Sequence, residues 1–157
     1  MKKVYNIDLS MSGIKELELG LKEYERWVKR KSEELCQRLA ELGAQKAEVN
    51  FASVYYDGPE DHAIAVEKRG DGYAVVASGT TVLFVEFGSG LIGYGHPEAN
   101  GMGPGTYPGK GHWDDPGGWY YAHGQHSHGN PPNMPMYNAV KELEMDLERV
   151  VREVFVI

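Results

Sequence analysis

The sequence contains a single cysteine, Cys36, so no disulfide can form within the chain. It also lacks any apolar run of about 18 residues, the length that a membrane-spanning helix requires. The two lysines that open it, in MKKVYNIDLS, are not followed by the apolar stretch of a secretion signal. These absences predict a chain that uses no disulfide framework, no membrane and no signal peptide. The single cysteine fits either a reducing compartment or a fold that needs no disulfide.

Basic residues are outnumbered, because 16 lysines and arginines face 23 aspartates and glutamates, for a formal net charge of -7. Contacts to phosphate need a basic surface, so this balance argues against a nucleic-acid-binding protein, and we expect no sequence-specific nucleic-acid partner. A hydrophobic content of 41% is typical of a globular chain. The length of 157 residues fits a single domain over 1–157.

The region 1–46 predicts a short extended arm followed by helices. Apolar residues alternate with polar ones at 5–9, and from Ser12, the expected N-cap, apolar residues recur at three- and four-residue steps. Gly20 predicts a break or bend, and Gly43 predicts the C-terminal end of the long helix. The apolar stripe comprises Ile14, Leu17, Leu21, Tyr24, Val28, Leu35, Leu39 and Leu42.

The region 47–87 predicts a small, mainly antiparallel sheet of three to four strands. Alternation around Val49 and Phe51 indicates the first strand. Gly70 and Asp71 lie between two apolar runs and predict a hairpin turn; they belong to an Arg-Gly-Asp tripeptide, for which the turn composition is a sufficient explanation. The run 80–87, TTVLFVEF, fits either a strand or a short helix.

The region 88–132 predicts a long loop, because glycine, proline and aromatic residues dominate and no helical or strand period persists. Long segments of this kind are usually functional or disordered, and disordered linkers are poor in aromatic residues. We therefore expect the segment to pack on a partner surface. The candidate interface residues are Phe87, Tyr94, Tyr107, His112, Trp113, Trp119, Tyr120 and Tyr121.

The region 133–157 predicts an amphipathic C-terminal helix packed on the sheet. Asn133 is the expected cap and Pro135 fits the first turn. The stripe from Met136 to Val154, which includes Leu147, is expected to be buried. Helix, strands, long loop and helix in this order predict an α+β domain.

Motifs for catalysis are absent or incomplete. GPGTYPGKGH lacks the glycine spacing and the Ser or Thr of a phosphate-binding loop, and the glycine spacing around Ser89 is not that of a nucleophile elbow. His123, His126 and His128, with His96, His112, Asp114 and Asp115 nearby in sequence, carry enough imidazole and carboxylate for zinc. They lie among glycines without a rigid supporting element, so we expect no metal, no cofactor and no catalytic residue. A metal-dependent hydrolase using the three histidines remains the alternative.

Three stretches, taken in order, resemble a known family. They are the long helix up to LCQRLAELGA, then TTVLFVEFGSG, then NPPNMPMYNAVKELEMDLERVVREVF. This arrangement resembles the phage tail-completion or neck proteins of the HK-ninety-seven gene-ten-like family, in which a Val-Glu-Phe/Tyr-Gly-Thr/Ser stretch closes the sheet region and a P-x-M-x-x-A segment opens the last helix. Here 85–89 and 135–139 occupy those places, and 135–139 reads Pro-Met-x-x-Ala, one residue shorter than the second pattern. The loop from about 90 to 130 is outside the resemblance.

The resemblance implies a structural subunit without catalysis, present in a virion or prophage tail-like particle and assembled in the bacterial cytoplasm. It implies a homo-oligomeric ring where head meets tail, with the connector or adaptor and the tail terminator or tail tube as partners. A tail terminator is the alternative within this class. We expect no membrane partner.

Overall fold

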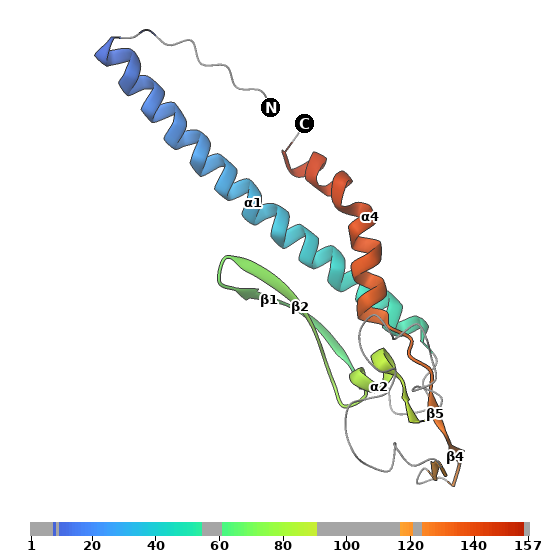
Figure 1. Cartoon of the computed structure of the whole chain (residues 1–157). Coiled ribbons are helices and arrows are strands. Elements are labelled where there is room, and N and C mark those ends of the chain that lie inside the picture. The colour runs from blue at the N-terminus through green and yellow to red at the C-terminus, as the bar shows by residue number, and fades with distance from the viewer. Residues whose placement is uncertain (1–7, 9, 55–60, 91–116, 121–123, 156–157) are drawn as a thin grey trace.

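The computed structural model describes residues 8, 10–54, 61–90, 117–120 and 124–155 (Figure 1). It has the expected α+β layout of a long N-terminal helix, small antiparallel sheets of two strands each, and a packed C-terminal helix. The elements are α1 (Met11–Ser53), β1 (Ala63–Arg69), β2 (Gly72–Ser78), α2 (Val82–Phe87), β3 (Trp119–Tyr120), β4 (His126–Ser127), β5 (Gly129–Asn130) and α4 (Pro135–Phe155).

Helix α1 begins two residues earlier than predicted. Ser10, not Ser12, is its N-cap, and the Ser10 hydroxyl accepts a hydrogen bond from the Gly13 amide at 3.2 Å. Gly20 does not end or divide the helix, although glycine in a helix interior costs about 1 kcal/mol relative to alanine. The residues on both sides of Gly20 are helical, so α1 continues through this position.

Helix α1 also ends later than predicted, at Ser53, so the expected helix end at Gly43 and the expected strand around Val49 are both wrong. Gly43, Ala47 and Phe51 are buried at four-residue spacing on one helix face, whereas Val49 is exposed. The helical period thus overrides the local alternation. Gly43 lies within the helix and does not cap it, and a Cβ there would make ordinary van der Waals contacts with Leu143 at 3.4 Å and Val75 at 3.5 Å.

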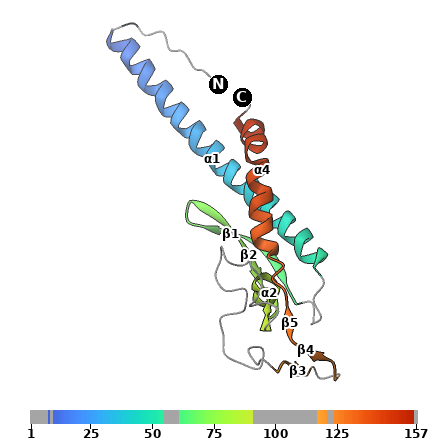
Figure 2. The ribbon, with the colours of Figure 1, turned by 45° about the vertical axis from the view of Figure 1, so that its right-hand side comes forward.

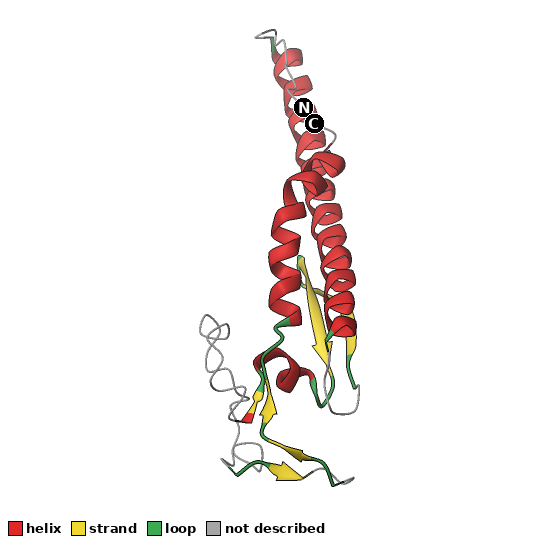
Figure 3. Cartoon of the chain, turned by 90° about the vertical axis from the view of Figure 1, so that its right-hand side faces the viewer, coloured by secondary structure: helices red, strands yellow, loops and turns green. Residues whose placement is uncertain are grey.

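The hairpin at Gly70 and Asp71 is confirmed. Strands β1 and β2 pair antiparallel with Arg69 opposite Gly72, which leaves a two-residue turn in which Gly70 has a φ of 59°. The hairpin lies along α1 (Figure 3). The Lys68 ammonium donates a hydrogen bond to the Glu33 carboxylate of that helix at 2.5 Å. Only this two-stranded sheet and the β3–β4 pair form among the described residues.

The core lies where α1, the hairpin, α2 and the start of α4 meet (Figure 2). Phe51, Val82 and Val85 are buried there, and Ile64 and Met136 pack against them. The run 80–87 therefore forms a short helix, and the strand alternative is excluded. Burial of Val82 and Val85 on one side of a single helical turn explains this outcome.

Helix α4 runs antiparallel beside α1 and buries only part of its apolar stripe (Figure 1). Ala139, Val150 and Val154 are buried, but Val140 and Leu147 are exposed. The expectation that the whole stripe is buried is therefore wrong for these two positions. Their exposure leaves an apolar strip on the outside of α4.

Candidate interaction surfaces

Glu86 connects α2 to the first turn of α4. Its carboxylate accepts hydrogen bonds from the Met136 amide at 2.9 Å and the Tyr137 amide at 3.0 Å. Its own carbonyl and that of Val85 accept from Met134 and Asn133, at 3.3 and 2.9 Å. The Met136 and Tyr137 amides lie in the first turn of α4, where backbone amides have no acceptor within the helix. Glu86 therefore caps α4 from a distant element, in place of the expected cap by Asn133.

The environment of Glu86 opposes its charge. Its side chain is only 4% exposed, and burial raises the pKa of the carboxyl above its ordinary value of 4.5. The two backbone amides act in the opposite direction, because they stabilise the carboxylate. A helix N-terminus is also a favourable place for an anion. Burying the carboxylate costs free energy, and the hydrogen bonds that it accepts fix the start of α4 beside α2.

The residues directly before and directly after segment 91–128 pair with each other, and we call this pairing the base of the segment. Ser89 and Gly90, directly after α2, form antiparallel bridges with Asn130 and Gly129 of β5. The Ser89 hydroxyl accepts a hydrogen bond from the Asn130 amide at 3.3 Å. The residues that precede and follow the glycine- and aromatic-rich segment in sequence are thus adjacent in space.

This base requires glycine on both strands. Gly90 has a φ of 62° and Gly129 a φ of 111°, values that residues with a side chain rarely adopt. A Cβ on Gly129 would lie 1.8 Å from the Ser89 carbonyl oxygen, and a Cβ on Gly90 would lie 2.4 Å from that of His128. The two backbones can approach only because neither residue carries a side chain.

The described end of this segment is a small aromatic hairpin. Strands β3 and β4 pair antiparallel with Tyr120 opposite His126. The Tyr120 ring lies 4.5 Å from that of His126 and is 72% exposed. The His126 ring lies edge-on to His128 at 4.6 Å. This hairpin lies at the end of the molecule opposite the start of α1 (Figures 1 and 2).

Three of the eight candidate interface residues fall in the described part of the chain. Tyr120 is exposed, and Trp119 and Phe87 are half-buried. Phe87 ends α2, whereas Trp119 and Tyr120 form β3, so the structure places them on two different elements. The other candidates lie outside the described residues: Tyr94, Tyr107, His112, Trp113 and Tyr121.

The histidines divide in the same way. His126 and His128 are described, and the His126 Nε2 lies 3.0 Å from the Gly117 carbonyl oxygen, which fits an N–H donor at that nitrogen. No group of three or more His, Cys, Asp or Glu side chains suited to a metal ion occurs among the described residues. His96, His112, His123, Asp114 and Asp115 lie outside them.

Comparisons of the chain with family models, with curated proteins and with solved structures found no match. In the parts of the chain that the structure describes, no helix is both long and apolar enough to span a bilayer.

Glu86 is the one residue at this junction whose role sequence reasoning missed. The sequence places Glu86 in the Val-Glu-Phe-Gly-Ser stretch at 85–89, and its role as a cap was not predicted. The available signal was a lone acidic residue inside the apolar run VLFVEF, together with a last helix that begins at Pro135 without an acidic residue in its first turn. A buried carboxylate needs hydrogen-bond donors, and the start of a helix supplies them.

Proposed function

We propose that the protein is a structural, non-catalytic subunit of a bacteriophage or prophage tail-like particle, and that it joins the head or connector to the tail as a neck or tail-completion ring. The proposal rests on the resemblance carried by 85–89 and 135–139, and a tail terminator is the alternative within the class. The proposal includes self-assembly into a ring, contacts with connector and tail proteins, and a place in the virion.

The joined base at Ser89, Gly90, Gly129 and Asn130 is the structural observation that supports this proposal. It fixes the two ends of a segment rich in glycine and aromatic residues next to α2, which is hydrogen-bonded to the start of α4. Protein interfaces are enriched in aromatic side chains at their core. A segment of this composition, with its two ends held together, suits a docking element that contacts a neighbouring subunit.

The contact between Glu86 and α4 supports the same function. It ties the base of the segment to the helix that packs along α1. A force or a docking partner acting on the segment would therefore act on the helical body and not on a loose linker. This connection suits a subunit that holds two assemblies together.

Replacing segment 91–128 by two to four glycines tests the docking role. Because Gly90 and Gly129 are bridge partners, their Cα atoms are about 5 Å apart, and a short turn can join them. We expect the variant to retain its helix content and cooperative melting. We expect it not to restore joined particles when it is supplied to a particle-forming host that lacks this chain.

Tyr120→Ser is the point-substitution counterpart, because the ring is exposed and its loss should leave folding unchanged. Tyr137→Ser, on α4, is the matched control away from the hairpin. Joined particles formed at the normal yield by the shortened chain would overturn the docking role of the segment.

A further inference from the structure

Two imidazole rings meet at the described end of segment 91–128. His126 lies in β4 and His128 follows it by two residues, the spacing that places side chains on the same face of an extended chain. Their ring centroids are 4.6 Å apart, and the ring planes are at 89° to each other. Both residues are exposed, so a small solute can reach the two rings from the solvent.

The His126 ring is held in one orientation from two sides. Its Nε2 lies 3.0 Å from the Gly117 carbonyl oxygen, so Nε2 carries the proton and donates it. The Tyr120 ring packs against the same imidazole at 4.5 Å. A neutral imidazole has a single N–H, so this hydrogen bond leaves a lone pair at Nδ1. Histidines that bind metals usually have their second nitrogen fixed by a carbonyl or carboxylate in this way.

Gly118 lets both rings approach the backbone of one residue. It has a φ of 75°, and a Cβ there would lie 3.0 Å from His128 Nδ1 and 3.1 Å from His126 Cε1. The same Cβ would lie 2.3 Å from the Ser127 carbonyl oxygen, so this position cannot carry a side chain without a shift of the hairpin. Because Cε1 is bonded to Nδ1, the rings meet over Gly118 with His128 Nδ1 and the Nδ1 side of His126 on that face.

The spacing of the rings suits two ligands of one metal ion. An imidazole nitrogen lies about 2.0–2.1 Å from a bound zinc ion, which puts the ring centroid about 3.2 Å from the metal. Two ligand rings separated by about 90–110° at the ion then have centroids about 4.5–5.2 Å apart. The observed 4.6 Å falls within this range, so rotation about side-chain bonds of the exposed histidines can complete the geometry.

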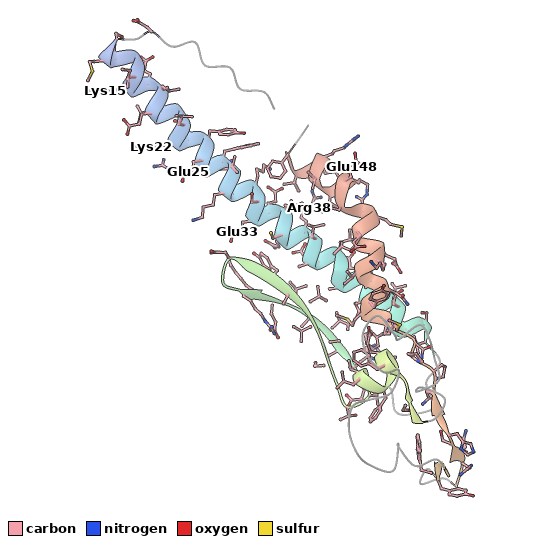
Figure 4. All side chains as sticks on the ribbon, in the orientation of Figure 1. Lys15, Lys22, Glu25, Glu33, Arg38 and Glu148 are labelled. Atoms are coloured by element: carbon pink, nitrogen blue, oxygen red, sulfur yellow. The ribbon has the colours of Figure 1, made fainter. Side chains whose placement is uncertain are left out.

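The carboxylates labelled on the helices are remote from this hairpin. Figure 4 shows Glu25 and Glu33 on α1 and Glu148 on α4, all far from the end of the molecule that carries β3 and β4. These three side chains therefore cannot serve as further ligands. Zinc accepts two protein ligands together with water, so water can fill the remaining positions.

We propose that His126 and His128 bind one divalent transition-metal ion, of the class of Zn²⁺ or Ni²⁺, through the Nδ1 atom of each ring. Imidazole is a suitable ligand for both ions. The sequence predicted no metal because the histidines lacked a rigid supporting element. The pairing of β3 with β4 and the hydrogen bond to the Gly117 carbonyl provide that support. The inference does not depend on the proposed function.

Calorimetric titration of the untagged chain with Zn²⁺ tests the site. A Cys36→Ser background removes the exposed thiol, which would itself bind zinc. We expect one zinc ion per chain, and His126→Ala and His128→Ala should each weaken binding by about tenfold or more, since loss of a group that merely orients a ligand costs about 10–100-fold. Gln125→Ala, at an exposed neighbouring position, is the matched control and should keep the affinity.

A second variant separates this pair from the other histidines. Replacing His96, His112 and His123 by alanine retains His126 and His128, so zinc should bind with unchanged affinity. Loss of binding in this variant, unchanged binding when His126 and His128 are both alanine, or no binding by the parent chain would overturn the proposal.

Nitrogen-15 NMR of the imidazoles tests the ligand atoms. Without metal, His126 should show the proton on Nε2, as its hydrogen bond to Gly117 requires. Zinc should shift the Nδ1 signals of His126 and His128. A shift confined to the Nε2 signals would contradict the assigned ligand atoms.

Discussion

Removing the carboxylate of Glu86 should destabilise the protein more than the loss of any exposed charge. In Glu86→Ala, the amides of Met136 and Tyr137 lose their acceptor. A helix cap is worth about 1 kcal/mol, and a hydrogen bond to a charged group roughly 1.5–3 kcal/mol. Part of this stabilisation offsets the cost of burying the charge. We therefore expect Glu86→Ala to lower the free energy of unfolding by about 3 kcal/mol.

For a chain of this length, that loss corresponds to a decrease in Tm of about 6–12 °C, measurable by calorimetry. Glu144→Gln is the control, because Glu144 is exposed and pairs with the exposed Lys141; its Tm should stay within about 2 °C of the wild type, as expected for an exposed ion pair. A Glu86→Ala variant as stable as this control would refute the assignment of Glu86 as the cap of α4.

The pH dependence of Glu86→Gln gives an independent test. The folded state raises the pKa of Glu86, so it binds the proton more tightly than the unfolded state does. The contribution of this group to stability is therefore complete below its ordinary pKa of 4.5 and declines as the pH rises through the folded pKa. The stability difference between wild type and Glu86→Gln should accordingly be larger near pH 4.5 than at neutral pH, and an increase toward neutral pH would contradict the raised pKa.

Three further outcomes follow from the same packing. Val154→Asp should unfold at markedly lower denaturant than Leu147→Asp, because a buried unpaired carboxylate costs roughly 3–5 kcal/mol and the Leu147 site is half-exposed. Gly129→Ala should destabilise by more than Gly124→Ala, since both have positive φ but only Gly129 meets the Ser89 carbonyl; equal Tm values would contradict the tight base. Asp61→Asn should lower stability at neutral pH and lose that effect as the pH falls below 3.8, because bonds from the Thr80 amide and hydroxyl depress the pKa of Asp61.

The sequence predicted elements that local signals determine. The turn at Gly70 and Asp71 was predictable, since the turn residues and the flanking apolar runs lie within one short stretch. The α+β class and the last helix followed from periodicity in the same way. These features depend on neighbours in sequence, which a sequence displays directly.

Other features depend on contacts between distant segments. The true end of α1 depends on Phe51 packing against α2, which overrides a strand-like alternation nearby. The cap of α4 depends on Glu86, 50 residues away from Met136 in sequence. The partial exposure of the apolar stripe on α4 depends on how much of that stripe α1 covers. Local patterns carry no information on such pairings.

Electron microscopy of particles from a host carrying or lacking this chain tests the central claim most directly. Loss of the chain should leave filled heads and tails that are complete but separate, and supplying the wild-type chain should restore joined particles. Gold-labelled antibody against the chain should then mark the junction of head and tail. Joined particles at the normal yield in the absence of the chain would contradict the account.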